Sequence, residues 1–235
     1  MIGFDRPLRP QWIYETLKMV EIGQKPIKYN KPFEDIAVEL VGKEGKRKAR
    51  TVLFRSFIYS FQAKNTKIES NPIIELVQTR TLEQLKPIFL VKLLMDYEIT
   101  RSVTNKIELL TDNSNIISIP PLSKRLVSEY GDRNVVKRSI RSFISTLCNF
   151  DVLSEVDNKT FKLTKRMKVE DEDLVDILKL YSTYFLKSEV VDLQQIPPQL
   201  FFYFDAPAFE DVAFAFNGVH WEYIKDVRRS VLMMK

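Results

Sequence analysis

Four segments between Leu122 and Thr164 decide the fold of this chain. In order along the chain they are LSKRLVSEYG (122–131), DRNVVKRSIRSFISTL (132–147), DVLSEV (151–156) and KTFKLT (159–164). The first two segments have the apolar spacing of helices. The last two are short, β-prone runs on either side of Asp157-Asn158, a dipeptide that favours a turn. The sequence therefore predicts a helix, a turn, a second helix and a β-hairpin.

The second predicted helix has two different faces. Its apolar face is predicted to be buried and consists of Val135, Val136, Ile140, Phe143, Ile144 and Leu147. Its polar face consists of Asn134, Lys137, Arg138, Arg141 and Ser145. We expect Asp132 to cap the N-terminus of this helix. A helix that is apolar on one side and cationic on the other, followed by a basic hairpin, is typical of a winged helix that binds the DNA major groove.

The winged-helix hypothesis assigns DNA contacts to basic residues. Arg138 and Asn134 are the types that pair bidentately with guanine and adenine, whereas Arg141 is expected at a phosphate. The predicted contacts are Arg133, Asn134, Lys137, Arg138 and Arg141 on the second helix, Lys124 and Arg125 on the first, and Lys159, Lys162, Lys165 and Arg166 in or after the hairpin. Winged helices also serve as protein–protein modules or plain scaffold, so these alternatives stay open.

The first 63 residues predict a three-helix, helix-turn-helix-like subdomain. The expected helices cover about 10–22, ended by Gly23, then 32–40 and 46–59, with a linker at 26–30 and a turn at 42–45. Lys43, Lys46, Arg47 and Arg50 form a cationic stripe on the third helix. Lys46, Arg47 and Arg50 are predicted as a second set of DNA contacts. A solvated helix face is the alternative.

The remaining segments predict further helices and little strand. Residues 64–71 are expected to be a loop, and 72 onward helical, with a capping box at Thr81 and Gln84 and a break or restart at Pro87. Residues 88–96 are expected to be buried and 100–110 helical, and 111–121 to be a loop or a short strand, 116–119, beside the hairpin. Beyond the hairpin we expect a helix at 174–186, with the carboxylates of 170–173 at its N-terminus. A proline-broken stretch is expected at 194–204 and a helix at 209–216, ended by Asn217-Gly218. The last segment, 220–234, is expected to be a strand, or else a helix.

These elements give a mainly α fold with a small β component. We expect an N-terminal helical subdomain (1–63), a helical linker region with the central winged helix (72–168) and a C-terminal α+β part (169–235). The net charge is +5, but residues 1–60 carry +5, residues 121–168 carry +6 and residues 169–235 carry −6. Such asymmetry favours a polyanionic partner for the earlier part of the chain, unless the charges cancel in space after folding.

Composition argues against most catalytic and membrane classes. With one histidine and one cysteine the chain lacks the ligands of an ordinary zinc site, and it has no glycine-rich phosphate loop and no nucleophile elbow. His220 is expected to pack on Trp221 and Cys148 to be a small core residue. We therefore predict no enzyme activity, no cofactor, no metal and no small-molecule substrate, although abundant carboxylates leave a metal-dependent nuclease open. The absence of a signal segment and of a spanning run predicts a cytoplasmic protein without a membrane partner.

The chain resembles the BrxA family of the bacterial BREX phage-defence systems. The resemblance rests on the short N-terminal helical subdomain, the central EYGDRNVVKRSIRSFISTLCNFDVL (129–153) and a C-terminal part with a short helix, Asn217-Gly218 and a Trp-containing strand. It implies a small, non-enzymatic protein that binds double-stranded DNA and acts beside a methyltransferase and ATPases of the same system. Family members have been labelled inner-membrane proteins, but this sequence has no segment that predicts a membrane span.

We therefore predict a non-enzymatic, double-stranded DNA-binding accessory protein of antiviral defence, whose partners are DNA and other proteins of the same system. One alternative is an assembly subunit that uses the winged helix and the acidic, aromatic C-terminal part as docking surfaces. Another is a winged-helix transcription regulator.

Overall fold

The computed structural model describes residues 2–63, 66–111, 115–227 and 229–235. Helices account for 57% and strands for 13%, so the predicted mainly α fold with a small β component is confirmed. The chain forms two compact units, Met1–Lys165 and Arg166–Lys235. The N-terminal helices and the helix–hairpin segment thus belong to one unit, and the boundary lies at the end of the hairpin.

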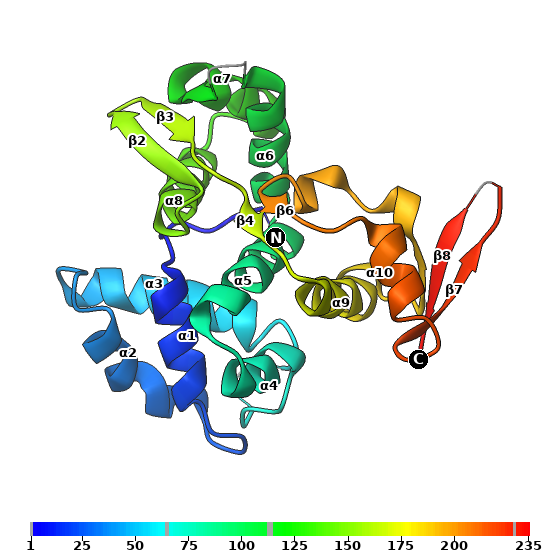
Figure 1. The fold of residues 1–235 in the computed structure, drawn as a ribbon. Coiled ribbons are helices and arrows are strands. Elements are labelled where there is room, and N and C mark those ends of the chain that lie inside the picture. Colours follow the sequence, from blue (N-terminus) through cyan, green and yellow to red (C-terminus); the bar gives the residue numbers. More distant parts are fainter. Residues whose placement is uncertain (1, 64–65, 112–114, 228) are drawn as a thin grey trace. The chain divides into compact units, whose positions relative to one another are not determined.

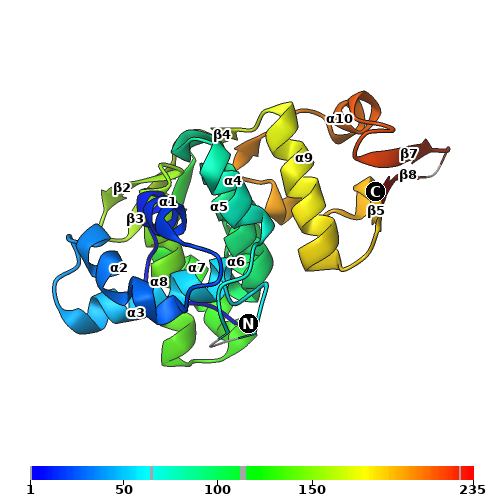
Figure 2. The ribbon, with the colours of Figure 1, turned by 90° about the horizontal axis from the view of Figure 1, so that it is seen from below.

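Helices dominate the first unit (Figure 1). They are α1 (Pro10–Met19), α2 (Asn30–Ile36), α3 (Lys43–Phe57), α4 (Pro72–Thr79), α5 (Leu82–Asp96), α6 (Glu98–Leu110), α7 (Ile119–Tyr130) and α8 (Asn134–Asn149). Helix α5 contacts α1, α3, α4 and α6, and it lies among them in both views (Figure 1 and Figure 2). Residues 88–95 are almost completely buried, which confirms the predicted core segment.

Several predicted helix ends are wrong. Helix α1 stops at Met19 rather than near Ile22, because Val20 takes extended backbone and its N–H bonds to Leu17 O at 3.2 Å. Helix α2 begins before Pro32 and ends at Ile36, and the expected linker at 26–30 is a 3₁₀ turn, Pro26–Tyr29. The turn expected at 42–45 ends at Gly42, and Gly45 lies within α3. Each error is a few residues at a helix end, where local signals are weakest.

Pro87 does not break or restart its helix, contrary to prediction. Helix α5 runs through Pro87, with the predicted capping box at Thr81 and Gln84 at its start. The Thr81 N–H donates to Gln84 Oε1 at 3.0 Å. Burial on every side of α5 outweighs the one backbone hydrogen bond that the proline cannot make. Residues 66–71 are non-helical as expected, while residues 64–65 and 112–114 lie outside the described part of the chain.

A three-stranded sheet follows α6 and continues after α8. Strand β1 (Ile116–Ser118) pairs antiparallel with β3 (Thr160–Leu163), which pairs with β2 (Leu153–Asp157), so the order is β1-β3-β2. This confirms the expected short strand beside the hairpin. The two prolines after β1 lie in the first turn of α7, where the missing N–H costs no intrahelical bond.

An extended segment before α1 packs against α6 and α8. The Ile99 N–H donates to Ile2 O at 2.9 Å, the Leu8 N–H donates to Thr146 Oγ1 at 3.1 Å, and Asn149 Nδ2 donates to Leu8 O at 2.9 Å. A Cβ atom at Gly3 would lie 2.5 Å from Ser139 Oγ. This backbone approach requires glycine. The N-terminal segment therefore holds the buried side of α8 in place.

The second unit contains a mixture of short elements. They are β4 (Met167–Lys168), α9 (Asp171–Leu180) continuing into a π-helical turn (Tyr181–Leu186), β5 (Val190–Asp192), 3₁₀ turns Leu193–Gln195 and Pro198–Leu200, β6 (Phe204–Asp205), α10 (Phe209–Ala215), β7 (Trp221–Lys225) and β8 (Ser230–Met234). Strand β4 pairs parallel with β6, and a separate antiparallel sheet has the order β5-β8-β7. The expected C-terminal strand is in fact a hairpin of two strands. Glu170 and the next three carboxylates occupy the start of α9 as predicted.

Candidate nucleic-acid interface

The turn between α7 and α8 positions the polar face of α8. Gly131 has φ +84° and ends α7. The Arg133 guanidinium donates to Tyr130 O at 3.2 Å from Nε and 2.9 Å from Nη2, which satisfies a carbonyl at the end of α7. Arg133 is therefore partly engaged as a helix cap, although its side chain remains exposed.

The prediction that Asp132 caps α8 is wrong. Arg133 occupies the N-cap position with extended backbone, and no side chain makes the capping hydrogen bond. Asp132 instead forms an ion pair with Lys137. That ion pair partly neutralises one of the predicted DNA contacts.

The amphipathic pattern of α8 is confirmed except at one position. Val136, Ile140, Phe143, Ile144 and Leu147 are at most 3% exposed. Phe143 packs edge-on against Phe4, with ring centroids 6.4 Å apart. Val135, which was predicted to be buried, is 43% exposed. Val135 lies in the first turn of α8, before the part of the helix that packs against the N-terminal segment.

A groove runs between α8, the start of α7 and the hairpin. It has a volume of about 650 Å³ and an apolar floor that includes Ile140, Ile144 and Phe161. Three predicted contacts line it, namely Lys137, Arg141 and Lys159, together with Asn158 and Ser145. The structure therefore brings cations of the helix and of the hairpin turn to one concave surface.

The hairpin turn is fixed by a short-range hydrogen bond. The Lys159 N–H donates to Asp157 Oδ1 at 2.8 Å, and this bond lowers the pKa of the Asp157 carboxyl below its usual value. Lys162 lies on the opposite face of the sheet from Phe161, because neighbouring side chains of a strand alternate. Lys162 is therefore exposed but not part of the groove.

Six of the predicted contacts have exposed side chains that form no ion pair, although the charge of one of them, Lys159, helps to lower the pKa of Asp157. They are Lys124, Arg125, Arg138, Arg141, Lys159 and Lys162, and the statement holds for the part of the chain that the structure describes. Asn134 is likewise exposed, at the first position of α8. Lys165 is exposed at the end of the first unit, whereas Arg166 begins the second, where its guanidinium lies 5.8 Å from the Phe202 ring.

The predicted contacts on α3 differ, because each is bound to a neighbour. Lys46 Nζ donates to Glu34 O at 2.6 Å, and Arg47 pairs with Glu44 at 2.8 Å. Arg50 donates to Asn30 O at 3.3 Å and lies 4.0 Å from Glu34, and burial lowers its pKa below the usual value. These side chains connect α3 to α2 or to its own first turn.

Other residues considered from the sequence have ordinary structural surroundings. Among the described residues no group of three or more metal-ligating side chains gathers, and no helix is long and apolar enough to cross a membrane. His220 lies 5.9 Å from Trp221 and stacks on Phe216 at 5.6 Å between ring centroids. Burial raises the pKa of the Cys148 thiol to about 11, so it is protonated at neutral pH.

Comparison with known proteins adds no relative: no family model, no curated protein and no solved structure matches this chain. The resemblance to the BrxA family therefore stays a prediction.

Proposed function

We propose that the first unit binds double-stranded DNA through the exposed face of α8 and the adjoining groove. One observation carries the proposal. Arg138 and Arg141 are exposed without acidic partners in the described chain, and Arg141 lines one groove with Lys137 and Lys159. On α3, by contrast, Arg47 and Lys48 both pair with Glu44. A cluster left without counter-charges favours a polyanion as its partner.

The geometry of α8 suits a major groove. A helix with its side chains is about 10–12 Å across, and the groove of B-DNA is about 12 Å wide. Asn134 lies in the first turn of α8 and exposes an amide that pairs with a base edge, while Arg138 reaches a phosphate from the next turn. Arg141 and Lys159, which line the protein groove between α8 and the hairpin, then face the phosphates of the DNA backbone. This arrangement gives many phosphate contacts and few base contacts, so binding tolerates sequence changes.

The biological role that we propose follows from the resemblance to BrxA proteins. In this role the chain is a non-enzymatic accessory protein of a phage-defence system and holds DNA for other proteins of that system. Nothing in the described part of the chain suggests a metal centre.

The proposal is tested by fluorescence anisotropy with a labelled 20-base-pair duplex. We expect the variant Lys137→Ala/Arg138→Ala/Arg141→Ala to bind at least about tenfold more weakly than the unmodified chain, because each lost charge-assisted contact weakens binding. The control Lys31→Gln/Lys67→Gln removes two exposed cations elsewhere on the unit and should bind normally. Equal binding by the triple variant and the unmodified chain would refute the proposal.

A second function, docking of a partner protein, is favoured by an observation on the second unit. Val190 is 49% exposed, Ile224 49% and Met233 42%. The register of β5, β8 and β7 places these three side chains on one face of the sheet. The same face also carries Glu222 and Asp192, and exposed apolar side chains among charged ones are typical of a protein interface. If it docks a partner, the variant Ile224→Lys/Met233→Lys should lose a co-purifying protein and keep its affinity for DNA.

A further inference from the structure

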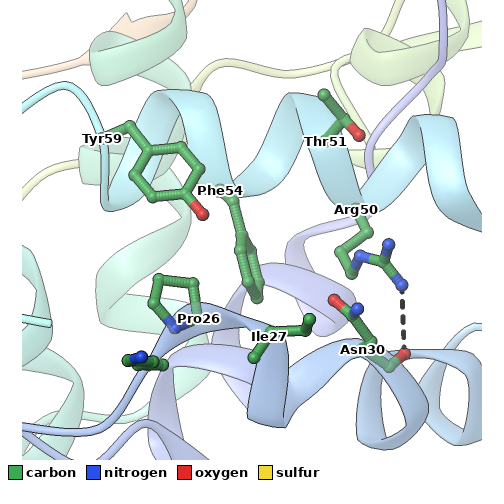
Figure 3. Close-up of a pocket in the computed structure, with 8 residues that line it drawn as sticks. Pro26, Ile27, Asn30, Arg50, Thr51, Phe54 and Tyr59 are labelled. Atoms are coloured by element: carbon green, nitrogen blue, oxygen red, sulfur yellow. Dashed lines mark hydrogen bonds between the residues drawn. The ribbon is translucent and has the colours of Figure 1, made fainter. Parts of the chain in front are cut away.

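The N-terminal subdomain has a pocket that is separate from the α8 groove. Arg50, one of the basic residues that the sequence assigned to DNA, lines this pocket. The 3₁₀ turn Pro26–Tyr29 and the start of α2 form one wall, and α3 with Tyr59 forms the other (Figure 3). Its volume is about 490 Å³. That lies within the range of about 300–1,000 Å³ that is usual for small-molecule sites.

The walls of this pocket are apolar and partly aromatic. Phe54 is 4% exposed, and its ring points from α3 toward Pro26 and Ile27 (Figure 3). Ile27 is 72% exposed at the rim. A flat ring lying on Ile27 would cover exposed apolar surface.

The polar side chains that line the pocket are cationic or neutral. Arg50 and Lys25 line it with Asn30, Thr51 and Tyr59, and no carboxylate lines it. Burial raises the pKa of Tyr59, which keeps its hydroxyl protonated as a hydrogen-bond donor at neutral pH. The lining therefore offers several donors and two positive charges to a ligand.

Arg50 is the partly buried cation of the pocket. Its side chain is only 15% exposed, yet in the described chain its partners are one carbonyl, Asn30 O at 3.3 Å, and one carboxylate, Glu34 at 4.0 Å. A guanidinium has five N–H donors, and no Arg50 nitrogen is buried without a partner, so the donors that make no bond within the described chain are open to the pocket. An anionic group in the pocket would accept from these donors in bidentate geometry.

We propose that this pocket binds a small molecule that combines a flat ring with an anionic group. The anion contacts Arg50 and Lys25, and the ring lies against Ile27. Inorganic phosphate would leave most of the volume empty, and an uncharged ring would make no ionic contact with Arg50 or Lys25. A nucleotide and an aromatic carboxylate share the required chemistry. The proposal departs from the sequence, which predicted no small-molecule ligand, and it does not depend on DNA binding.

Isothermal titration calorimetry with the full chain tests the proposal with four probes. We expect AMP or indole-3-acetate to bind saturably with a Kd below about 1 mM, and adenosine and inorganic phosphate to bind at least about tenfold more weakly. Tighter binding of AMP identifies the nucleotide class, and tighter binding of indole-3-acetate identifies the aromatic acids. Saturable binding of neither, or adenosine binding as tightly as AMP, overturns the proposal.

Two similarly exposed residues provide a matched pair of variants. Ile27→Glu puts a carboxylate at the rim and should weaken binding of the anion at least about tenfold. Val38→Glu makes the same change at a side chain that is 69% exposed in the same subdomain and does not line the pocket, so it should leave binding unchanged. Equal affinity of the two variants would overturn the assignment. Both positions are on the surface, so neither change should prevent folding.

Discussion

The salt dependence of DNA binding gives the sharpest test of the α8 surface. Five exposed, unpaired cations face DNA in the proposed complex, namely Lys124, Arg125, Arg138, Arg141 and Lys159. Each phosphate contact contributes about −0.9 to the slope of log K against log salt, so we expect a slope of about −4.5. Raising the salt from about 50 to 200 mM should then weaken binding by about 500-fold.

Removing two of these cations should flatten the slope by a defined amount. The variant Arg138→Gln/Arg141→Gln has three contacts left, so its slope should be about −2.7, and the same rise in salt should weaken binding by only about 40-fold. The comparison variant Arg47→Gln/Lys48→Gln also removes two positive charges, but both side chains pair with Glu44. We therefore expect its slope to equal that of the unmodified chain.

The assay is equilibrium anisotropy at five or more salt concentrations with one duplex for all three proteins. An unchanged slope for Arg138→Gln/Arg141→Gln would refute the assignment of phosphate contacts to α8. A flatter slope for Arg47→Gln/Lys48→Gln would show that the DNA-binding surface extends to α3, as the sequence predicted.

Three further predictions concern stability in urea or with pH. Gly3→Ala should lower the free energy of unfolding by about 1–3 kcal/mol, because its Cβ would lie 2.5 Å from Ser139 Oγ; an unchanged urea midpoint would contradict this. Phe143→Ala, at a fully buried position, should cost about 3–5 kcal/mol in the same assay, and a smaller loss would mean that the cavity collapses. Burial lowers the pKa of Lys92 from 10.5 to about 8. The folded chain therefore loses this proton at a lower pH than the unfolded chain does, so its stability relative to Lys92→Met should rise as the pH is raised from about 8 to 10.5, whereas a constant difference would exclude the shift.

Periodicity predicted the elements whose burial repeats regularly. The two-faced pattern of α8 has one interpretation in terms of local packing, and the structure contains it. The apolar run of α5 is buried on all sides as expected, whereas the turn predicted at Asp157-Asn158 lies one residue later, at Asn158-Lys159, because Asp157 ends β2. Helix ends were less predictable. Val20 ends α1 with a bond to Leu17 O, and Asp132 pairs with Lys137 instead of capping α8, so both ends depend on local choices that the residue types do not decide.

The N-terminal segment could not be predicted because its contacts are distant in sequence. Residues 2–9 have no helical or strand period, and Leu8 bonds to Thr146 and Asn149. One signal was available, since Gly3 and Phe4 form a small–large pair before a proline-initiated helix. That signal indicates close packing, but it does not name the partner. Only the fold shows that this segment supports α8.

The candidate site illustrates a further limit, because residue type does not determine which cations are available to a ligand. Arg47 and Arg138 are equivalent in sequence terms, since both lie on the polar face of a basic helix. In the structure Arg47 is bound by Glu44 one turn away, whereas Arg138 has no acidic partner in the described chain. An occupied cation gains little from a phosphate, because the new contact replaces one that already exists. The surface available to DNA is therefore smaller than the count of Lys and Arg suggests, and the paired charge variants measure that difference.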